Sequence, residues 1–280
     1  MISGKAKLAG VMGWPVGHSL SPLLHGFWLR ELGIDGTYVP LAVTPEDCAA
    51  VLKTLPRMGF QGCNVTVPHK ETALATVDEV DHQAQRIGAV NTVVVAEDGR
   101  LLGRNTDAYG FMANLQAGLA DWSAAQGPAV VLGAGGAARA VIVGLLDAGC
   151  PEIRLTNRTR NRAEAVAGDI PGPITVTDWD RRSDSLEGAA LLVNTTTLGM
   201  AGQPPLEMPL DGLSSRAVVT DIVYAPLQTV LLRQAAERGH RTVDGLGMLL
   251  HQAVPGFEAW FGPRPEVSDA LRRHMLDSLG

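Results

Sequence analysis

Three glycines set close together mark a stretch of the sequence suited to nucleotide binding. Gly133, Gly135 and Gly136 follow the short apolar run 129–132 and precede a segment with an apolar stripe at helical spacing. This order predicts a buried strand, a tight turn and a helix, the fingerprint of dinucleotide-binding folds, with Ala138 in place of the third glycine. Gly133 would permit the sharp turn and Gly135 the close approach of a pyrophosphate, while the helix N-terminus would offer N–H groups to the phosphates. By itself the pattern also fits a strand-to-helix turn that binds nothing.

The residues after the next apolar run favour NADP over NAD as the ligand of this loop. An NAD site usually carries Asp or Glu here, to bind the 2′-hydroxyl of the ribose. This chain has Asn157 and Arg158 instead. A carboxylate would repel a 2′-phosphate, whereas a guanidinium can bind it with two hydrogen bonds. A solvated helix start is the alternative explanation for Arg158, Arg160 and Arg162, and it suffices for Arg160.

A second group of polar residues follows an apolar run in the first half of the chain. Segment 60–67 is predicted to be a strand in which Asn64 and Thr66 share one face, near the carboxyl end where open α/β sheets bind ligands. Lys70 comes just after it, at the predicted start of a helix. A cation is poorly placed there because the helix dipole is positive at that end, so Lys70 is either functional or simply exposed. An acid/base role is the functional interpretation.

Two serines lie on an earlier loop that leads into a helix. Ser21 precedes Pro22, so it is expected to cap a helix over 22–32, and Ser19 lies two residues before it. Hydroxyls at a helix N-terminus can bind a carboxylate or another hydroxyl. Capping alone would explain Ser21, but it does not explain Ser19.

Further polar residues end the strands predicted at 89–95 and 101–107. Asn91 lies in the first of them, and Asn105, Thr106 and Asp107 end the second. Turn formation is an equally good explanation for Asn105.

The elements that would position these residues divide into two series. The first half predicts strands at 7–13, 37–43, 60–67, 89–95 and 101–107, with a helix over 44–58 and an Asp98-Gly99 turn. From 129 to 245, strands and helices alternate as a doubly wound parallel sheet requires. We therefore expect an α/β protein of two domains: a mixed-sheet domain over 1–107, joined by C-terminal helices 246–280, and a Rossmann-type domain over 108–245, with a helix over 108–120 between them.

Composition narrows the class of protein further. The chain has 280 residues, a formal net charge of −6 and no basic run long enough to follow a nucleic acid. We see no apolar stretch of the roughly 18 residues that a membrane span needs, and no signal-peptide core near the start. The 3 cysteines and 7 histidines lack metal-ligand spacing. The expectation is a cytoplasmic protein that binds a small molecule and holds no metal.

Four blocks together resemble the shikimate dehydrogenase family. They are Gly13-Trp14-Pro15-Val16-Gly17-His18-Ser19-Leu20-Ser21-Pro22, Asn64-Val65-Thr66-Val67-Pro68-His69-Lys70, Gly88-Ala89-Val90-Asn91-Thr92 and Gly103-Arg104-Asn105-Thr106-Asp107. The glycine loop and the Asn157-Arg158-Thr159 segment are similar to the family's NADP site. The resemblance implies NADPH-dependent reduction of 3-dehydroshikimate to shikimate, a step of aromatic amino-acid biosynthesis. His25-Gly26 and His82 depart from the usual family pattern, which leaves close substrate specificity open.

The resemblance also assigns roles to individual residues. Lys70 would be the catalytic acid/base and Asp107 its partner. Ser19 and Ser21 would bind the substrate carboxylate, and the other substrate contacts would be Asn64, Thr66, Asn91, Tyr224 and Gln252. The cofactor contacts would be Gly133, Ala134, Gly135, Gly136, Ala137, Asn157, Arg158, Thr159, Arg162, Ile222 and Gly245.

Other functions are compatible with much of this pattern. A quinate or aminoshikimate dehydrogenase would use the same scaffold, and a non-catalytic NADP-binding sensor would need only the cofactor residues. A nucleotide-dependent methyltransferase is weakened by the Arg158 segment. A homodimer is an assembly that the sequence allows.

Overall fold

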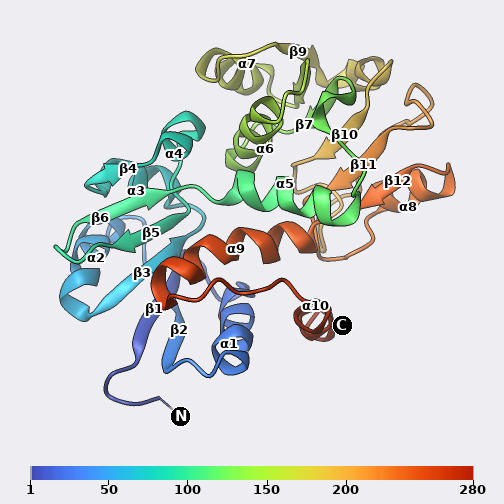
Figure 1. The fold of residues 1–280 in the computed structure, drawn as a ribbon. Coiled ribbons are helices and arrows are strands. Elements are labelled where there is room, and N and C mark those ends of the chain that lie inside the picture. The colour runs from blue at the N-terminus through green and yellow to red at the C-terminus, as the bar shows by residue number, and fades with distance from the viewer. Residues whose placement is uncertain (1, 280) are drawn as a thin grey trace. The chain divides into compact units, whose positions relative to one another are not determined.

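The computed structural model describes residues 2–279, which form two compact units (Figure 1). Unit 1 contains the chain up to Thr106 and from Leu250 onward, and unit 2 is Asp107–Leu249. The sequence-based boundaries lie at 107/108 and 245/246. Each unit has its own six-stranded sheet.

The sheet of unit 1 is mixed. Its strand order is β2-β1-β3-β5-β6-β4. β1 pairs in parallel with β2 and β3, and β4 pairs in parallel with β6, whereas β5 is antiparallel to β3 and β6. The mixed sheet expected for this part of the chain is confirmed. The strands are β1 (Lys7–Gly13), β2 (Gly36–Ala42), β3 (Phe60–Val65), β4 (Glu79–Val80), β5 (Thr92–Val95) and β6 (Leu101–Arg104).

Two helix starts in unit 1 differ from the expectation. α1 (Ser21–Glu31) begins at Ser21 itself, its N-cap position is Leu20, and no side chain caps it, so the expected capping role of Ser21 is wrong. The helix expected over 44–58 is also too long. Residues 45–47 form a turn, and α2 (Cys48–Thr54) and the 3₁₀ helix η1 (Leu55–Met58) follow. The other helices that lie wholly in unit 1 are α3 (Lys70–Thr76), α4 (His82–Ile87) and α10 (Asp269–Asp277).

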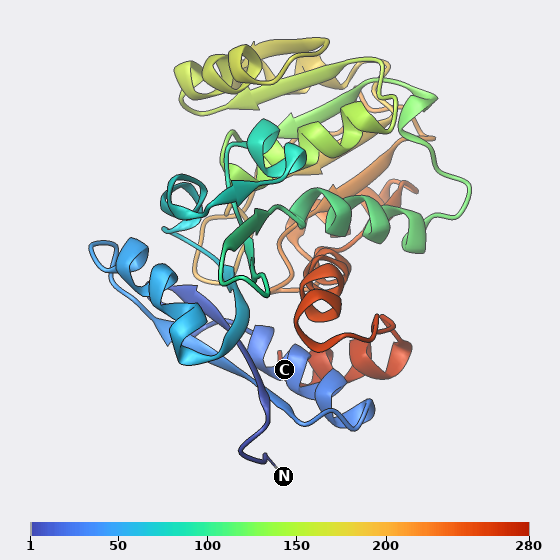
Figure 2. The same cartoon turned by 60° about the vertical axis from the view of Figure 1, so that its left-hand side comes forward.

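The end of the chain packs on its beginning in unit 1. α10 contacts α1, and both ends of the described chain lie in the same part of the ribbon in Figure 2. The rings of Phe27 and His274 lie 5.2 Å apart. The indole N–H of Trp28 donates a 2.9 Å hydrogen bond to the carbonyl of Glu266. α9 (Leu246–Phe261) contains the boundary at 249/250 and supplies Trp260, whose indole N–H donates to Val93 O of β5 at 3.0 Å. These contacts explain why the last segment of the chain belongs to unit 1.

The sheet of unit 2 is wholly parallel, in the order β12-β11-β10-β7-β8-β9. This is the strand order of doubly wound dinucleotide-binding folds, in which the direction of winding reverses between the first and fourth strands, here β7 and β10. The expected Rossmann-type sheet is confirmed. The strands are β7 (Ala129–Leu132), β8 (Ile153–Asn157), β9 (Ile174–Asp178), β10 (Leu191–Asn194), β11 (Val218–Asp221) and β12 (Arg241–Val243).

The helices of unit 2 pack on the strands of this sheet or on one another. α5 (Asp107–Gly118) and α6 (Gly136–Asp147) lie side by side (Figure 1), α7 (Arg160–Asp169) packs on β8 and β9, and α8 (Val230–Glu237) packs on β11 and β12. The 3₁₀ helices are η2 (Ala124–Gln126) and η3 (Trp179–Leu186). Within residues 2–279, no helix combines the length and apolar character needed to cross a bilayer.

Candidate functional site

The glycine loop lies where the winding of the unit 2 sheet reverses. Gly133 directly follows β7 with φ of 109°, and a Cβ atom there would lie 2.6 Å from Oγ1 of Thr195. At Gly135 and Gly136, by contrast, an added Cβ would meet no heavy atom within 4 Å. The first glycine is therefore required by the turn itself, whereas the next two leave open space beside the loop. Open backbone at this place is what a pyrophosphate needs.

The start of α6 adds donors to the same place. Its N-cap position is Gly135, and no side chain caps the helix. The N–H groups of a first helical turn have no intrahelical partner, so they are available to an anion. Ala134 and Ala137 are half-buried beside the exposed glycines, and Ala138 is fully buried against the sheet, as expected for the third position of the motif.

Arg158 follows β8 as an exposed residue, and neither it nor Arg162 forms an ion pair with any residue between 2 and 279. Arg160, in contrast, contacts Glu164 at 2.7 Å and Asp178 at 2.6 Å, which confirms the structural interpretation of that residue.

The segment that carries these arginines is held by a local contact. The side-chain amide of Asn157 donates to Thr159 O at 2.8 Å, and Thr159 is the N-cap residue of α7. Two guanidinium groups thus remain available next to the point where cofactor choice is made.

The ends of β10, β11 and β12 supply further parts of the unit 2 site. Ile222 and Tyr224 are half-buried on the loop after β11, and burial raises the pKa of Tyr224. A Cβ on Gly245 would lie 2.3 Å from Ile222 O, so close packing of the loops after β11 and β12 already requires glycine there. Asn194 and Asp221 end β10 and β11, are fully buried, and hydrogen-bond to each other at 2.9 Å. Sequence reasoning assigned no role to this pair, although its signal was visible as polar residues that end apolar strands.

A buried polar network occupies the corresponding end of the unit 1 sheet. Asn64 is 6% exposed on β3. Its Oδ1 accepts a 2.6 Å hydrogen bond from the Tyr38 hydroxyl, and its Nδ2 donates to Thr92 Oγ1 at 3.1 Å and to Asn91 O at 3.2 Å. The structure thus brings Asn64 and Asn91 together, and it adds Tyr38 and Thr92, which sequence reasoning missed.

Asn91 extends this network to the end of β6. Its Oδ1 accepts from Thr106 N–H at 2.9 Å, and its Nδ2 donates to Thr106 Oγ1 at 3.1 Å. Asp107 comes directly after Thr106, is 8% exposed and begins α5. The side-chain amide of Asn105 donates to Ala89 O at 2.9 Å, a tertiary contact with a residue 16 positions earlier. The tertiary contacts of Asn91 therefore fix the backbone that leads into Asp107.

Lys70 is half-buried at the first position of α3. The residue before it, His69, is 1% exposed, and its Nε2 donates to Val43 O at 2.8 Å because a carbonyl can only accept. β3 ends at Val65, so Thr66 lies one residue beyond the strand, although its N–H still donates to Met12 O of β1 at 2.9 Å. Pro68, which lacks an N–H group, keeps the following backbone out of the ladder.

Ser19 and Ser21 are joined at the start of α1, since Ser21 N–H donates to Ser19 Oγ at 3.3 Å. Ser21 is 8% exposed and Ser19 is half-buried. Gln252 is half-buried on α9.

His25 lies beneath this network in an aromatic setting. Its ring stacks on Tyr38 with centroids 3.9 Å apart and an interplanar angle of 2°. It is fully buried, and burial lowers its pKa to about 3, an effect that the neighbouring Asn64 only partly opposes. Neither ring nitrogen has a partner of full hydrogen-bond geometry among residues 2–279. His25 is therefore a neutral packing residue at ordinary pH.

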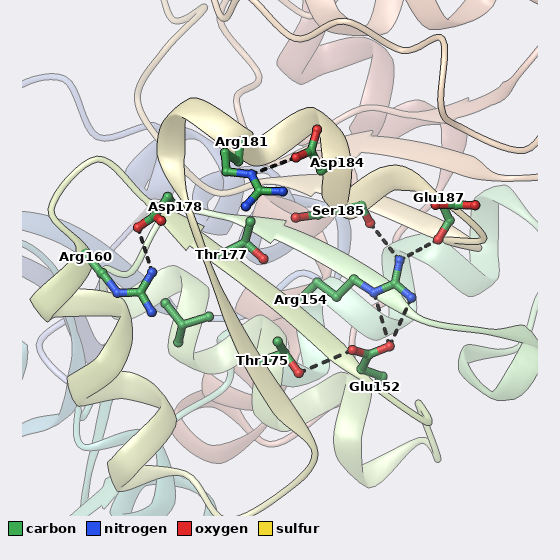
Figure 3. A pocket seen from close by; sticks show the side chains of 11 residues that line it. Glu152, Arg154, Arg160, Thr175, Thr177, Asp178, Arg181, Asp184, Ser185 and Glu187 are labelled. Atoms are coloured by element: carbon green, nitrogen blue, oxygen red, sulfur yellow. Dashed lines mark hydrogen bonds and ion pairs between the residues drawn. The ribbon is translucent and has the colours of Figure 1, made fainter.

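A separate pocket of about 550 Å³ in unit 2 is lined by charged side chains that contact one another (Figure 3). Arg154 donates to Ser185 O at 2.9 Å and to Glu187 O at 2.5 Å and pairs with Glu152 at 3.1 Å. Arg181 pairs with Asp184 at 2.9 Å. Since carboxylates and carbonyls already engage these arginines, the pocket does not present free charge to a ligand. Within residues 2–279, no three His, Cys, Asp or Glu side chains gather as a metal site would require.

The parallel sheet, its glycine loop and the arginines after β8 define an NADP-dependent dehydrogenase with a second α/β unit. Two family models match the chain: the shikimate dehydrogenase substrate binding domain over residues 11–93 and shikimate / quinate 5-dehydrogenase over residues 116–198. The chain belongs to the shikimate dehydrogenase family, which confirms the resemblance seen in its motifs.

Individual relatives are similar over nearly the whole chain. Shikimate dehydrogenase (NADP(+)) of Paramagnetospirillum magneticum is 64% identical, covering 98% of this chain and 100% of that protein. The protein of the same name from Rhodospirillum rubrum is 62% identical, covering 99% of each chain. Among solved structures, shikimate 5-dehydrogenase of Thermus thermophilus in complex with NADP(H) and shikimate is 41% identical, with a TM-score of 0.85 and coverage of 96% of this chain and 99% of that one.

Proposed function

We propose that the protein catalyses the reaction for which its family is named, the reversible, NADPH-dependent reduction of 3-dehydroshikimate to shikimate in aromatic amino-acid biosynthesis. The observation that carries the proposal is 64% identity to a shikimate dehydrogenase (NADP(+)) over 98% of the chain. The site geometry supports the proposal. Both units place uncharged hydrogen-bonding groups at the carboxyl ends of their strands, together with Lys70 after β3 and Arg158 after β8.

NADP is the cofactor, and unit 2 supplies its contacts. The open backbone of the glycine loop and the start of α6 would hold the pyrophosphate. Arg158 would bind the 2′-phosphate, since it is exposed and engaged by no carboxylate among residues 2–279. The remaining contacts are assigned as Gly133, Ala134, Gly135, Gly136, Ala137, Asn157, Thr159, Arg162, Ile222 and Gly245.

The substrate carries a carboxylate and several hydroxyls, which call for neutral donors and acceptors. We assign Ser19 and Ser21 to the carboxylate, since the Ser21 N–H holds the Ser19 hydroxyl at the start of α1. The buried network fixes the orientation of Asn64 and Asn91 before a substrate binds. The other assigned contacts are Thr66, Tyr224 and Gln252.

When bound in unit 2, NADPH would supply the hydride for reduction of the ketone carbon. Negative charge then develops on the ketone oxygen, and the Lys70 ammonium would stabilise it and donate a proton from Nζ. In the reverse direction the neutral Lys70 amine would accept the hydroxyl proton. Asp107 would orient Lys70.

The test is an assay at the NADPH absorbance band with shikimate and quinate as paired substrates. We expect NADP-dependent turnover of shikimate at a kcat/KM well above that for quinate. Faster turnover of quinate would indicate a quinate dehydrogenase. Tight NADP binding without turnover of either acid, or of aminoshikimate, would indicate a sensor.

Two finer expectations accompany this function. We expect the enzyme to act in the cytoplasm, where its 3 free, buried cysteines would stay reduced. A homodimer is the assembly that we would test first, by light scattering during size-exclusion chromatography. A mass near 29.5 kDa would exclude it.

A further inference from the structure

Asp221 is a buried carboxylate to which the assigned roles give no function. Its exposed fraction is 0%. It accepts hydrogen bonds from Val223 N–H at 3.0 Å, from Thr229 Oγ1 at 2.8 Å and from Asn194 Nδ2 at 2.9 Å. No cation among residues 2–279 forms an ion pair with it. Burying an unpaired charge is costly, so a side chain chosen only for packing would not be an acid.

Asn194 passes the orientation imposed by Asp221 to the loop after β10. The two residues are register partners on neighbouring strands. Besides Asp221, Nδ2 of Asn194 donates to Leu198 O at 3.1 Å, while Oδ1 accepts from Thr196 N–H at 3.0 Å and from Thr196 Oγ1 at 2.7 Å. Both amide hydrogens and both oxygen lone pairs are thus in use. Because an ionised carboxylate can only accept, Asp221 fixes the amide in the orientation that also serves Leu198 O and Thr196 N–H, and so helps to hold the loop.

The loop held in this way lies at the reversal point of the sheet, beside the glycine loop. Thr195 donates from Oγ1 to Leu132 O at 2.6 Å and from its N–H to the same oxygen at 2.8 Å. Leu132 is the residue directly before Gly133. The loop after β11 is tied to the same network, since Ile222 N–H donates to Asn194 O at 3.1 Å. Asp221 therefore anchors two loops that border the assigned cofactor site.

We infer that Asp221 is a positioning residue for NADP. It acts through Asn194 and the Val223 N–H to hold loops 195–198 and 222–224. In this conformation the two loops receive the nicotinamide half of the cofactor. Dinucleotide folds consist of two mononucleotide-binding halves, and β10–β12 form the second of them. The adenosine half, with its 2′-phosphate, would be bound by the half of the sheet formed by β7–β9 and by Arg158. This inference rests on the proposed cofactor site.

The test separates the two halves of the cofactor. Calorimetry would measure the Kd of NADP and of adenosine 2′,5′-bisphosphate, which carries only the adenosine half. We expect Asp221→Ala to weaken NADP binding about tenfold or more, as loss of hydrogen bonds to a charged group implies, and to change bisphosphate binding less than about twofold. Asp221→Asn keeps the shape and one acceptor oxygen, so about a threefold loss of NADP affinity is expected, and it decides the question if the alanine variant does not fold.

Thr220→Val is the matched control on the same strand. It removes another buried hydrogen bond, from Thr220 Oγ1 to Val243 O at 2.9 Å, without touching the two loops. We expect it to lower the Tm and to leave both Kd values unchanged.

Three outcomes would overturn the inference. The first is that the folded Asp221 variants bind NADP within twofold of the wild type, on the order of experimental error in affinity. The second is an equal loss of NADP and bisphosphate affinity, and the third is that Thr220→Val weakens NADP selectively as well. Failure of the proposed cofactor site has a different signature: the wild-type protein itself would bind neither ligand, which would overturn the site and the inference together.

Discussion

Gly133 and Thr195 lie so close that a Cβ atom on the glycine would stand 2.6 Å from the threonine Oγ1. The first loop of the Rossmann half that begins with β7 therefore packs directly against the first loop of the half that begins with β10. The contact depends on a glycine whose φ, 109°, is also one that other residues rarely adopt.

This relationship predicts that two neighbouring glycines respond differently to alanine. Gly133→Ala should lower the free energy of unfolding by roughly 2 kcal/mol or more, because it adds a clash to an unfavourable φ. Gly135→Ala meets no atom within 4 Å at a φ of −93°, so stability should hardly change. Its methyl group would nevertheless occupy space assigned to the pyrophosphate and weaken NADP binding. Denaturant unfolding and calorimetry measure the two effects, and equal stability losses in both variants would contradict this interpretation.

Arg158→Ala should separate NADP from NAD. Loss of a charged, two-pronged contact with the 2′-phosphate should cost on the order of 1.5–3 kcal/mol of NADP binding energy, while NAD affinity should hardly change. Arg160→Ala is the matched control, because that arginine is engaged by Glu164 and Asp178. An equal loss of NADP and NAD affinity in Arg158→Ala would remove the residue from the phosphate site.

Lys70→Ala should lower kcat by about a hundredfold or more, the scale of general acid/base assistance. Its KM for shikimate should change much less, since the serine and amide contacts remain. Steady-state kinetics on the purified, folded variant provide the measurement.

Two further variants sharpen this test. Lys70→Arg should not restore activity, because a guanidinium does not readily release its proton. Lys53→Ala, at an exposed position of α2, should behave as the wild type. A near-normal kcat in Lys70→Ala would return Lys70 to a structural role.

His25 should make the protein less stable in acid. Burial lowers the pKa of His25 from its ordinary 6.5 to about 3, so the unfolded chain binds a proton that the folded chain does not. The contribution of neutral His25 to stability is therefore fully present above pH 6.5 and falls as the pH drops toward 3, by about 2 kcal/mol between pH 7 and pH 5. Asp221 acts in the opposite direction, because burial raises its pKa to about 6 and the folded state gains a proton as the pH falls through that value.

A comparison of variants isolates the histidine contribution. His25→Phe keeps a ring against Tyr38 but cannot titrate, so its loss of stability from pH 7 to pH 5 should be about 2 kcal/mol smaller than that of the wild type. His18→Gln, at an exposed loop position, should show the wild-type difference. Parallel pH profiles for His25→Phe and the wild type would show that His25 is not the buried neutral group described.

The sequence by itself determined the features that depend on neighbours along the chain. The residues from Gly133 to Ala138 are consecutive in the chain, because the glycine loop is made by one strand, one turn and one helix. The lack of Asp or Glu beside Arg158 is likewise visible in a short stretch of sequence. The parallel sheet followed from the alternation of apolar runs and helices. Local pattern failed at helix starts: Ser21 resembles an N-cap, yet α1 begins on it and no side chain caps the helix.

Only the tertiary structure decided which polar residues meet. Tyr38 and Asn64 are 26 residues apart, and Asn194 and Asp221 are 27 apart, so their hydrogen bonds depend on strand order and register. Apolar periodicity shows that a strand is buried but does not reveal its neighbour. Burial also set the pKa values of His25 and Asp221, because the pKa of a side chain depends on what surrounds it in space and not on its neighbours along the chain.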